Sequence, residues 1–419
     1  SGLYKKLVKA QKLVSHVEIE SDGEIPEICY KVIQPELIDF ISYPYEWSFS
    51  QLKDAALLTL DIQKEALQAG LSLKDASAYN IQFQGARAVL IDTLSFEKYE
   101  EGSPWVAYRQ FCQHFLAPLV LMSRVDVRLS QLLRVHIDGI PLDLTARLLP
   151  WQSRLDFGLL SHIYLHANAQ QRYSDKQVRV SERKVNMSRL AMQGLIESLE
   201  NTVRKLTWTP KGTEWADYYH ITNYSDAAFE TKKELVSDLI KPLTPHSVWD
   251  LGANTGVFSR LALDVPGCQV VSSDIDPAAV ELNYRRCKQD GEERILPLVL
   301  DLTNPSPAIG WENKERSSFS QRGPADLLLA LALIHHLAIS NNVPLADVAR
   351  YMASLGKNLI IEFVPKSDSQ VQKLLASRLD IFPDYTPEGF VKAFSLYFDK
   401  KQEIPVGGTE RILYLFERK

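Results

Sequence analysis

The part of this 419-residue sequence best suited to bind a ligand is a turn that carries Gly252 and Gly256, with Asp250 just ahead of it. Glycine permits positive φ and lets backbone amides approach a ligand without an intervening Cβ. The apolar run Val248–Leu251 predicts a buried strand, and the run from Ser259 predicts a helix. The amides of the turn would then lie at a helix N-terminus, where donors lack partners, so we expect a polar, nucleoside-like ligand there.

The spacing and charge of this turn separate it from two common nucleotide sites. A dinucleotide site has the pattern G-x-G-x-x-G, whose amides hold a pyrophosphate, whereas here the two glycines lie four positions apart. A P-loop needs a Lys-Ser or Lys-Thr pair after its last glycine, but Val257 and Phe258 follow Gly256. The carboxylate of Asp250 instead suits a ligand with a cationic group such as an amine. The alternative is that the glycines only mark a tight turn between strand and helix.

Acidic residues follow two more predicted strands, where they can accept hydrogen bonds from a nucleoside. Asp274 comes directly after the strand predicted over Gln269–Ser273 and is placed to accept from both ribose hydroxyls. Asp301, with Leu302 beside it, follows the strand predicted over Ile295–Leu300 and is placed to accept from an adenine amino group. The three carboxylates are therefore expected at one edge of a single sheet.

Together these residues resemble the ordered motifs of class I S-adenosylmethionine-dependent methyltransferases. The resemblance implies a Rossmann-like domain with a seven-stranded sheet, S-adenosyl-L-methionine as the cofactor and methyl transfer as the reaction. It covers about the last 200 residues, and the whole chain is similar to bacterial nodulation-protein-related methyltransferases. The family pattern assigns cofactor binding to Asp250, Gly252, Asn254 (where many members carry Gly), Gly256, Asp274, Asp301 and Leu302, and a fourth-strand motif to Asp326 and the pair His335-His336.

Three residues after the fourth and fifth predicted strands could assist the transfer. His335 and His336 follow the strand Ala325–Leu331, at the end of the sheet where ligands bind. An imidazole that titrates near neutrality there could accept a proton from a hydroxyl or an amine, and of the two we favour His335. Glu362, in the strand Asn358–Phe363, is the second candidate base. The alternative places one histidine at the strand end and the other in the core, so that alignment alone supplies the rate.

Two segments with aromatic residues are expected to cover the acceptor. One spans residues 215–224 ahead of the domain, and the other is a long insertion between the third and fourth strands, residues 304–322. Aromatic side chains exclude water and can present polar atoms to a substrate. The sequence therefore predicts a small-molecule acceptor, methylated at oxygen or nitrogen. A peptide or protein acceptor, and a catalytically degenerate binding or scaffold protein, are the alternatives. The tentative acceptor contacts are Trp215, Tyr219, Tyr224 and Trp311.

The elements that position these residues alternate between strands and helices, as in a parallel sheet with helices on both faces. A helix over Asp226–Ile240 precedes the first strand, and Asp276 is expected to cap the helix that begins at Pro277. Glu410–Glu417 is expected as a last strand at the sheet edge. The predicted organisation is an α/β chain with a mixed α/β and helical accessory domain over 3–168, a linker with a bridging helix over 169–221, and the methyltransferase domain over 222–419.

One stretch of the N-terminal region resembles the catalytic loop of the protein-kinase-like fold. Asp75 and Asn80 stand five positions apart and Asp92 follows a predicted hairpin, residues that in that fold supply a base and two metal ligands. The sequence departs from the family pattern because it has no Gly-rich loop and no lysine strand, and because Thr93-Leu94 follows Asp92. Two interpretations stay open: a degenerate kinase-like fold, or an accessory domain whose polar loops match by chance.

Composition limits the partners. The 47 basic and 52 acidic residues give a formal net charge of −5, which argues against nucleic acid. No apolar run approaches the ~20 residues of a membrane span. Four cysteines without paired spacing suit a reducing cytoplasm and give no recognisable metal site. We therefore expect a cytoplasmic protein without a membrane, nucleic-acid or metal partner, and the sequence leaves its oligomeric state open.

Overall fold

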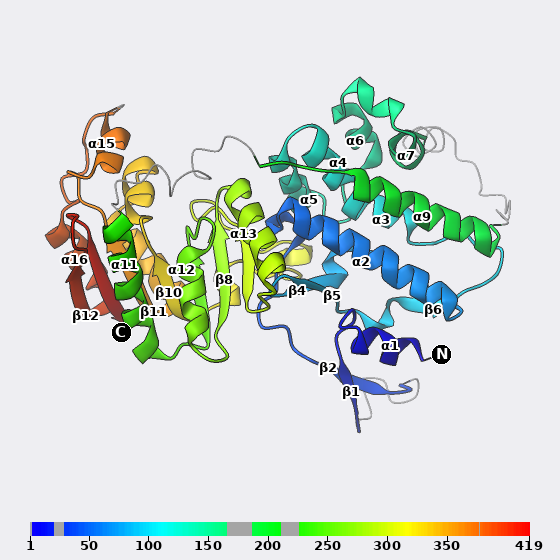
Figure 1. Ribbon diagram of the computed structural model, residues 1–419, viewed down its shortest axis with the longest axis horizontal. Helices are drawn as coiled ribbons and strands as arrows, with labels where there is room; N and C mark the ends of the chain where they lie inside the picture. The colour runs from blue at the N-terminus through cyan, green and yellow to red at the C-terminus, as the bar shows by residue number, and fades with distance from the viewer. Residues whose placement is uncertain (1, 21–28, 166–186, 211–225, 377) are drawn as a thin grey trace. The chain divides into compact units, whose positions relative to one another are not determined.

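The computed structural model describes residues 2–20, 29–165, 187–210, 226–376 and 378–419 (Figure 1). The chain forms two compact units, Ser1–Thr209 and Pro210–Lys419. Within the described ranges, no helix is both long enough and apolar enough to cross a membrane.

The first unit is organised around one long helix, α2 (Phe49–Gln68). It begins at a capping box, in which the Ser48 hydroxyl accepts from the Gln51 amide and the Gln51 side chain accepts from the Ser48 amide. One face of α2 is buried against α9 (Arg189–Lys205) and the short strand β3 (Leu71–Leu73). α9 lies within the range in which a bridging helix was predicted, and it packs within this unit.

Small hairpins and short helices complete the first unit. Among its described residues, the two-stranded sheets β1–β2, β3–β6 and β4–β5 are all antiparallel. Residues 105–164 are mostly helical. The remaining elements are α1 (Leu3–Lys9), β1 (His16–Ile19), β2 (Val32–Pro35), β4 (Ile81–Gln84), β5 (Arg87–Leu90), β6 (Phe96–Lys98), α3 (Tyr108–Phe111), α4 (Ala117–Arg124), α5 (Leu132–Val135), α6 (Leu142–Leu148) and α7 (Phe157–Leu159).

The three polar residues of the kinase-like stretch lie around the β4–β5 hairpin. Ser95 links two of them, because its hydroxyl donates to Asp92 Oδ2 at 2.5 Å and accepts from Asn80 Nδ2 at 3.2 Å. Asp75 accepts from the Ser77 amide at 2.9 Å. Each carboxylate thus stabilises its own turn, and no group of three His, Cys, Asp or Glu residues in the described part of the chain is placed to hold a metal.

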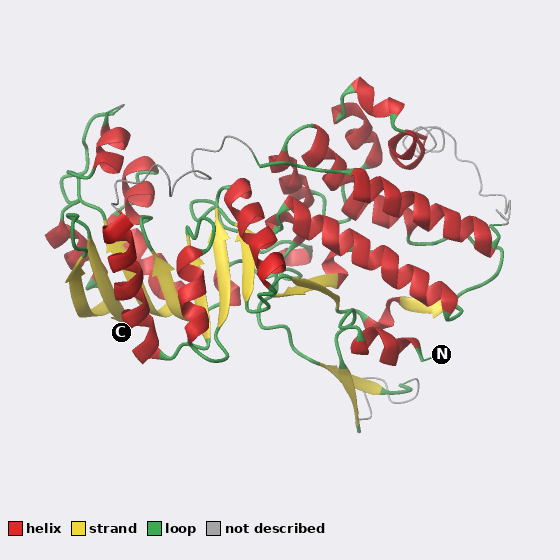
Figure 2. Ribbon diagram, viewed as in Figure 1, coloured by secondary structure: helices red, strands yellow, loops and turns green. Residues whose placement is uncertain are grey.

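The second unit contains a seven-stranded sheet in the order β12-β13-β11-β10-β7-β8-β9 (Figure 2). β13 runs antiparallel to both of its neighbours, and the pairs among β9, β8, β7, β10 and β11 are parallel. The expected α/β, Rossmann-like fold of this unit is confirmed. The strands are β7 (Ser247–Leu251), β8 (Gln269–Asp274), β9 (Ile295–Val299), β10 (Ala325–Ala330), β11 (Gly356–Phe363), β12 (Phe398–Pro405) and β13 (Ile412–Arg418).

Helices lie on both faces of this sheet (Figure 2). α13 packs against β8 and β9, and α14 packs against β10 and β11. Asp276 caps α13 as predicted, since its side chain accepts from the Ala278 amide at 2.9 Å. The helices are α11 (Asp226–Ile240), α12 (Val257–Leu261), α13 (Pro277–Asp290), α14 (Leu345–Leu355), α15 (Ser369–Leu375) and α16 (Pro387–Phe394).

The prediction for the last strand was wrong in one respect. β13 lies inside the sheet between β11 and β12, and the edge belongs to β12, which the sequence did not indicate. Most β12 residues are exposed, and Lys400 and Lys401 stand in its middle. Charged side chains on an edge strand discourage pairing with other chains and also remove the apolar alternation by which a strand is recognised.

Candidate active site

A pocket of about 380 Å³ opens at the carboxyl ends of the parallel strands in the second unit. The sheet order reverses between β7 and β10, and ligands of open α/β sheets bind at such a switch point. The volume lies in the range of small-molecule sites. The pocket is lined by Phe229, Lys232, Asp250, Gly252, Ala253, Asn254, Phe258, Asp274, Ile275, Leu300, Asp301, Leu302, Thr303, Leu331, Ala332, Leu333, His336, Leu337, Ser340, Asn341, Gln370, Lys373 and Leu374.

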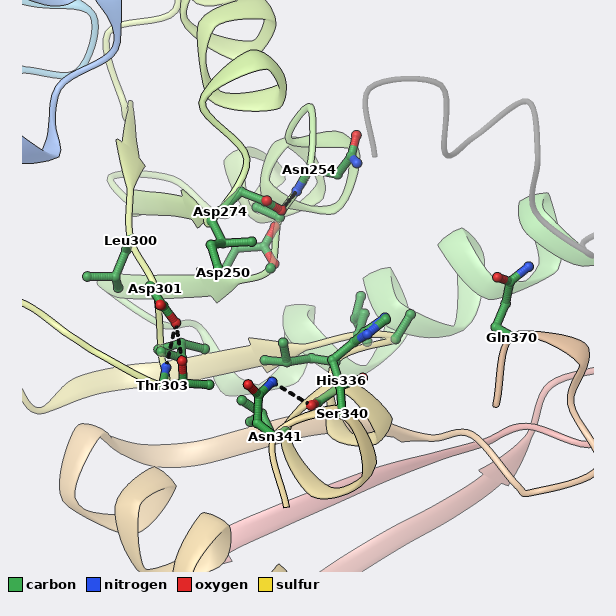
Figure 3. Close-up of a pocket in the computed structure, with 18 of the residues that line it drawn as sticks. Asp250, Asn254, Asp274, Leu300, Asp301, Thr303, His336, Ser340, Asn341 and Gln370 are labelled. Carbon is green, nitrogen blue, oxygen red and sulfur yellow. Dashed lines mark hydrogen bonds between the residues drawn. The ribbon is translucent and has the colours of Figure 1, made fainter. Parts of the chain in front are cut away.

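Asp274 ends β8 and fastens the glycine turn to the neighbouring strand. Its Oδ2 accepts from the Asn254 amide at 2.8 Å and its Oδ1 accepts from the Asp276 amide at 2.9 Å (Figure 3). Burial raises the pKa of Asp274 to about 6, against the lowering effect of these backbone hydrogen bonds. The carboxylate is therefore fixed in orientation and still lines the pocket.

Asp250, near the end of β7, is held by a hydrogen-bond network that includes two serine hydroxyls. Ser259 donates to Asp250 Oδ2 at 2.6 Å and lies 2.8 Å from the Ser272 hydroxyl, which accepts from Asn283 Nδ2 at 2.8 Å. Burial raises the pKa of Asp250 to about 7, and the hydrogen bond from Ser259 opposes that rise. A cation bound in the pocket would favour the ionised form of this carboxylate.

The residues of the glycine turn are required for different structural reasons. Gly252 lines the pocket at φ +76°, and a Cβ there would stand 3.3 Å from Leu333 Cδ1. Asn254 has φ +51°, a left-handed conformation that Asn adopts more readily than most residues. Gly256 does not line the pocket: a Cβ there would meet Asn283 and Arg260 at 2.5 to 2.7 Å. Its lack of a side chain lets the Asn283 and Arg260 side chains pack against the turn, and its assignment as a cofactor contact stays a prediction.

Asp301 and its neighbours form the end of the pocket beyond β9. The Asp301 carboxylate accepts from the amide and hydroxyl of Thr303 at 2.8 and 2.6 Å (Figure 3). Leu302 lines the pocket as predicted, and so does Ile275, whose side chain is 57% exposed although it is apolar. Ile275 was not among the predicted site residues. An apolar residue directly after the strand-end acid was the available signal in the sequence, and Ile275 offers an apolar face to a flat ring.

The two histidines differ in position. His336 lines the pocket at the start of the π-helix η12 (His336–Ser340), whereas His335 is fully buried outside it. Burial lowers the pKa of His336 to about 4 and that of His335 well below its usual range. Both shifts run against an imidazole that titrates near neutrality. Of the two rings, that of His336 lines the pocket and that of His335 does not, so we now favour His336 as the candidate base.

Glu362 is part of a buried ion-pair network and does not line the pocket. Its Oε2 lies 2.7 Å from Lys232 Nζ, and its Oε1 lies 3.8 Å from Arg411 Nη1. Arg411 also binds Asp368, with Nε 2.8 Å from Oδ2. Lys232, 2% exposed, reaches the pocket from α11, and the sequence analysis missed it because a lysine in an amphipathic helix is usually a surface residue. This geometry argues against Glu362 as a base.

Several residues singled out from the sequence lie elsewhere. Trp311 is 79% exposed and does not line the pocket. Asp326 stands at the amino end of β10, where it accepts from the His246 and Ser247 amides at 3.0 and 3.1 Å, and its role is to join two strands at the opposite edge of the sheet. Trp215, Tyr219 and Tyr224 lie outside the described residues.

The second wall of the pocket comes from segments after β10 and β11. η12 contributes Ser340 and Asn341, and α15 contributes Gln370 and Lys373. Between β10 and η12, Ala332 has φ +52°, an uncommon conformation for alanine that occurs at functional sites. These residues do not form a recognisable sequence motif, because they are distant in sequence and come together only where β10 and β11 are neighbours in the sheet.

The residues that line the pocket fit S-adenosylmethionine. A fixed buried carboxylate at Asp274 suits a pair of ribose hydroxyls, and one at Asp250 suits an ammonium or sulfonium group. Gly252 leaves room in the cradle that a Cβ would fill, and the apolar side chains of Ile275 and Leu302 suit an adenine ring. The described residues thus provide partners for the ribose, the cationic part and the adenine ring of the cofactor.

Comparison with known proteins identifies one close relative. A scan against protein-family models finds no match. The nodulation protein NoeA of Rhizobium meliloti (strain 1021) is 38% identical over 391 residues, which are 93% of this chain and 82% of that protein.

Similar solved structures overlap about half of the chain. Magnesium protoporphyrin IX methyltransferase (ChlM) from Synechocystis PCC 6803, with bound SAH, is 18% identical over 49% of this chain and 92% of its own, with a TM-score of 0.35. The N-methyltransferase NodS from Bradyrhizobium japonicum WM9 is 12% identical over 45% and 97%, with a TM-score of 0.32. The bifunctional kinase-methyltransferase WbdD is 16% identical over 51% and 45%, with a TM-score of 0.33.

Proposed function

Because the chain belongs to the family of the nodulation protein NoeA and is a class I S-adenosylmethionine-dependent methyltransferase, we propose that it methylates an oxygen or nitrogen of a small molecule. The observation that carries the proposal is the pocket at the switch point of the sheet, whose two walls differ in chemistry. One wall carries the buried acids Asp250 and Asp274. The other carries His336, Lys373 and neutral polar residues, and the volume of the pocket suits a small acceptor rather than a folded protein.

Different residues of the pocket then bind the cofactor and the acceptor. Asp274 orients the ribose, Asp250 balances the positive charge of the cofactor, and the cofactor supplies an electrophilic methyl group when bound. His336 is neutral because burial lowers its pKa to about 4, so it can accept a hydrogen bond or a proton from the acceptor at physiological pH. A ring of such low basicity holds a proton weakly, so we expect alignment of the acceptor to contribute most of the rate.

The first unit is proposed to be an accessory domain without phosphotransfer activity. Asp75, Asn80 and Asp92 are engaged in hydrogen bonds within their own turns and with Ser95. Tight binding of ATP to the full chain would argue for the kinase-like alternative.

Incubation with S-adenosylmethionine labelled at its methyl group tests the proposed acceptor class. The full chain is mixed with a bacterial extract, which is then separated into an ultrafiltrate and a protein fraction. We expect label in a new compound of the ultrafiltrate, and much less of it with the His336→Ala variant. Label confined to the protein fraction would favour a peptide or protein acceptor, and label in neither would favour a binding or scaffold role.

A further inference from the structure

The acids and the neutral polar side chains of the pocket lie on different sides of it (Figure 3). Asp250, Asp274 and Asp301 lie at or just beyond the ends of β7, β8 and β9. The half over β10 and β11 contains no carboxylate among the described lining residues, and two lysines, Lys232 and Lys373, line the pocket. The proposed function places the cofactor over the acidic half, which leaves the other half for the acceptor.

Lys373 differs from the other lysine that lines the pocket. Lys232 is buried, and its ammonium group lies 2.7 Å from the Glu362 carboxylate. Lys373, in the last turn of α15, is exposed, and among the described residues it makes no ion pair or side-chain hydrogen bond. Lys373 therefore lines the pocket without a compensating acid among the described residues.

The acids closest to α15 in sequence have cations of their own. Asp368, which caps α15, lies 2.8 Å from Arg411 Nε, and Asp380 lies 2.7 Å from Lys366 Nζ. These pairs leave neither carboxylate as a ready partner for Lys373. An anion that enters the pocket would meet the lysine with little competition.

Neutral polar groups stand in the same half. The Ser340 hydroxyl is buried and has no hydrogen-bond partner within the described residues, although Ser340 lines the pocket. Gln370 lies one turn of helix ahead of Lys373, on the same face of α15. A buried hydroxyl without a partner is costly, so a ligand atom that bonds to it would be stabilised.

We infer that the acceptor carries an anionic group, a carboxylate, phosphate or sulfate, which Lys373 binds with help from Gln370 and Ser340. The inference rests on the proposed function, because it assigns this half of the pocket to the acceptor. The same lysine chemistry could serve a second source of negative charge, the carboxylate of the cofactor's amino-acid part. α15 follows β11, and β10 separates β11 from the strands β7 and β8 that carry the cofactor-binding acids. This position favours the acceptor, rather than the cofactor, as the ligand of Lys373.

Calorimetry on the full chain separates the two sources. S-adenosylhomocysteine is first titrated into the wild type, Lys373→Gln, and Lys392→Gln as a matched control on α16. We expect dissociation constants within about twofold of one another, because Lys373 does not bind the cofactor. A tenfold loss confined to Lys373→Gln would assign the lysine to the cofactor's carboxylate and overturn the inference. Absence of binding to the wild type would instead refute the proposed function.

Inorganic phosphate then serves as the anionic probe on protein saturated with S-adenosylhomocysteine. We expect saturable binding to the wild type and to Lys392→Gln, at least about tenfold weaker binding to Lys373→Gln, and recovery in Lys373→Arg. The tenfold figure corresponds to the loss of one hydrogen bond to a charged group. No phosphate binding by the wild type, equal binding by Lys373→Gln, or displacement of S-adenosylhomocysteine by phosphate would overturn the inference.

Discussion

Disruption of the Lys232–Glu362 pair should lower the stability of the second unit more than its surface ion pairs do. Both side chains are at most 3% exposed, and Nζ lies 2.7 Å from Oε2. Removal of one partner leaves the other charge buried, which costs about 3–5 kcal/mol. Since Arg411 Nη1 remains 3.8 Å from Glu362 Oε1, we expect Lys232→Met to cost about 3 kcal/mol, at the lower end of that range.

The double variant gives a sharper test than either single change. Glu362→Gln should also cost about 3 kcal/mol, but Lys232→Met with Glu362→Gln should cost less than the sum by about 2 kcal/mol, because the second change removes the unpaired charge left by the first. Hydrogen exchange of peptides from β11 measures these free energies locally, so unfolding of the first unit does not interfere.

An exposed pair on β12 provides the control. Lys400 and Glu403 are 2.6 Å apart, with side chains 38% and 43% exposed. Their single variants should each cost less than about 1 kcal/mol. If Lys232→Met and Glu362→Gln cost no more than this control, or if their effects simply add, the description of a coupled buried network is wrong.

Three more predictions concern cofactor and catalysis. Asp274→Asn should weaken S-adenosylhomocysteine binding by roughly tenfold to a hundredfold, as measured by calorimetry, because hydrogen bonds to a charged acceptor are lost; an unchanged Kd would show that the carboxylate does not face the ligand. His336→Ala should lower kcat by about two orders of magnitude or more at unchanged cofactor affinity, whereas His335→Ala should lower the melting temperature instead; the reverse outcome would restore His335 as the base. Affinity for S-adenosylmethionine should rise between pH 6 and pH 8, because the cationic ligand favours the ionised forms of Asp250 and Asp274. Burial raises the pKa values of these two carboxyl groups to about 7 and about 6. Asp250→Asn should flatten the upper part of that rise, and a fall in affinity over this pH range would contradict the charge assignment.

The same raised pKa values determine how the ligand-free chain responds to pH. The folded state holds the Asp250 proton more tightly than the unfolded chain, whose carboxyl has the ordinary value of 3.8. The free energy of unfolding contributed by this group is therefore greatest at low pH and is lost as pH rises toward about 7. Cofactor binding should offset that loss.

Local patterns led to residues that line one side of the pocket, because each of these residues follows directly from a nearby strand or turn in the sequence. Asp250, Gly252 and Asp274 stand at strand ends or in a turn, and strand ends follow from hydrophobic runs. The role of Asp326 was mistaken because it acts through strand pairing, which no local pattern displays. β12 escaped detection because its exposed, charged residues lack the alternation of a half-buried strand.

The acceptor half could not be predicted because it depends on tertiary structure. Lys373 and Ser340 lie 33 positions apart and come together only because β10 and β11 are neighbours in the sheet. The burial that lowers the pKa of His336 comes from its surroundings in the fold, so the sequence suggested an ordinary imidazole. Glu362 looked like a free carboxylate because its ion-pair partner, Lys232, lies 130 positions earlier in the sequence.

Titration of S-adenosylhomocysteine into the full chain, beside Gly252→Val, tests most directly whether the pocket binds the cofactor. We predict saturable binding of one molecule per chain to the wild type. Gly252→Val should abolish it, because valine is strained at φ +76° and even its Cβ would stand 3.3 Å from Leu333 Cδ1. No binding to the wild type at millimolar concentration, or equal binding by Gly252→Val, would contradict the assignment of this pocket to S-adenosylmethionine.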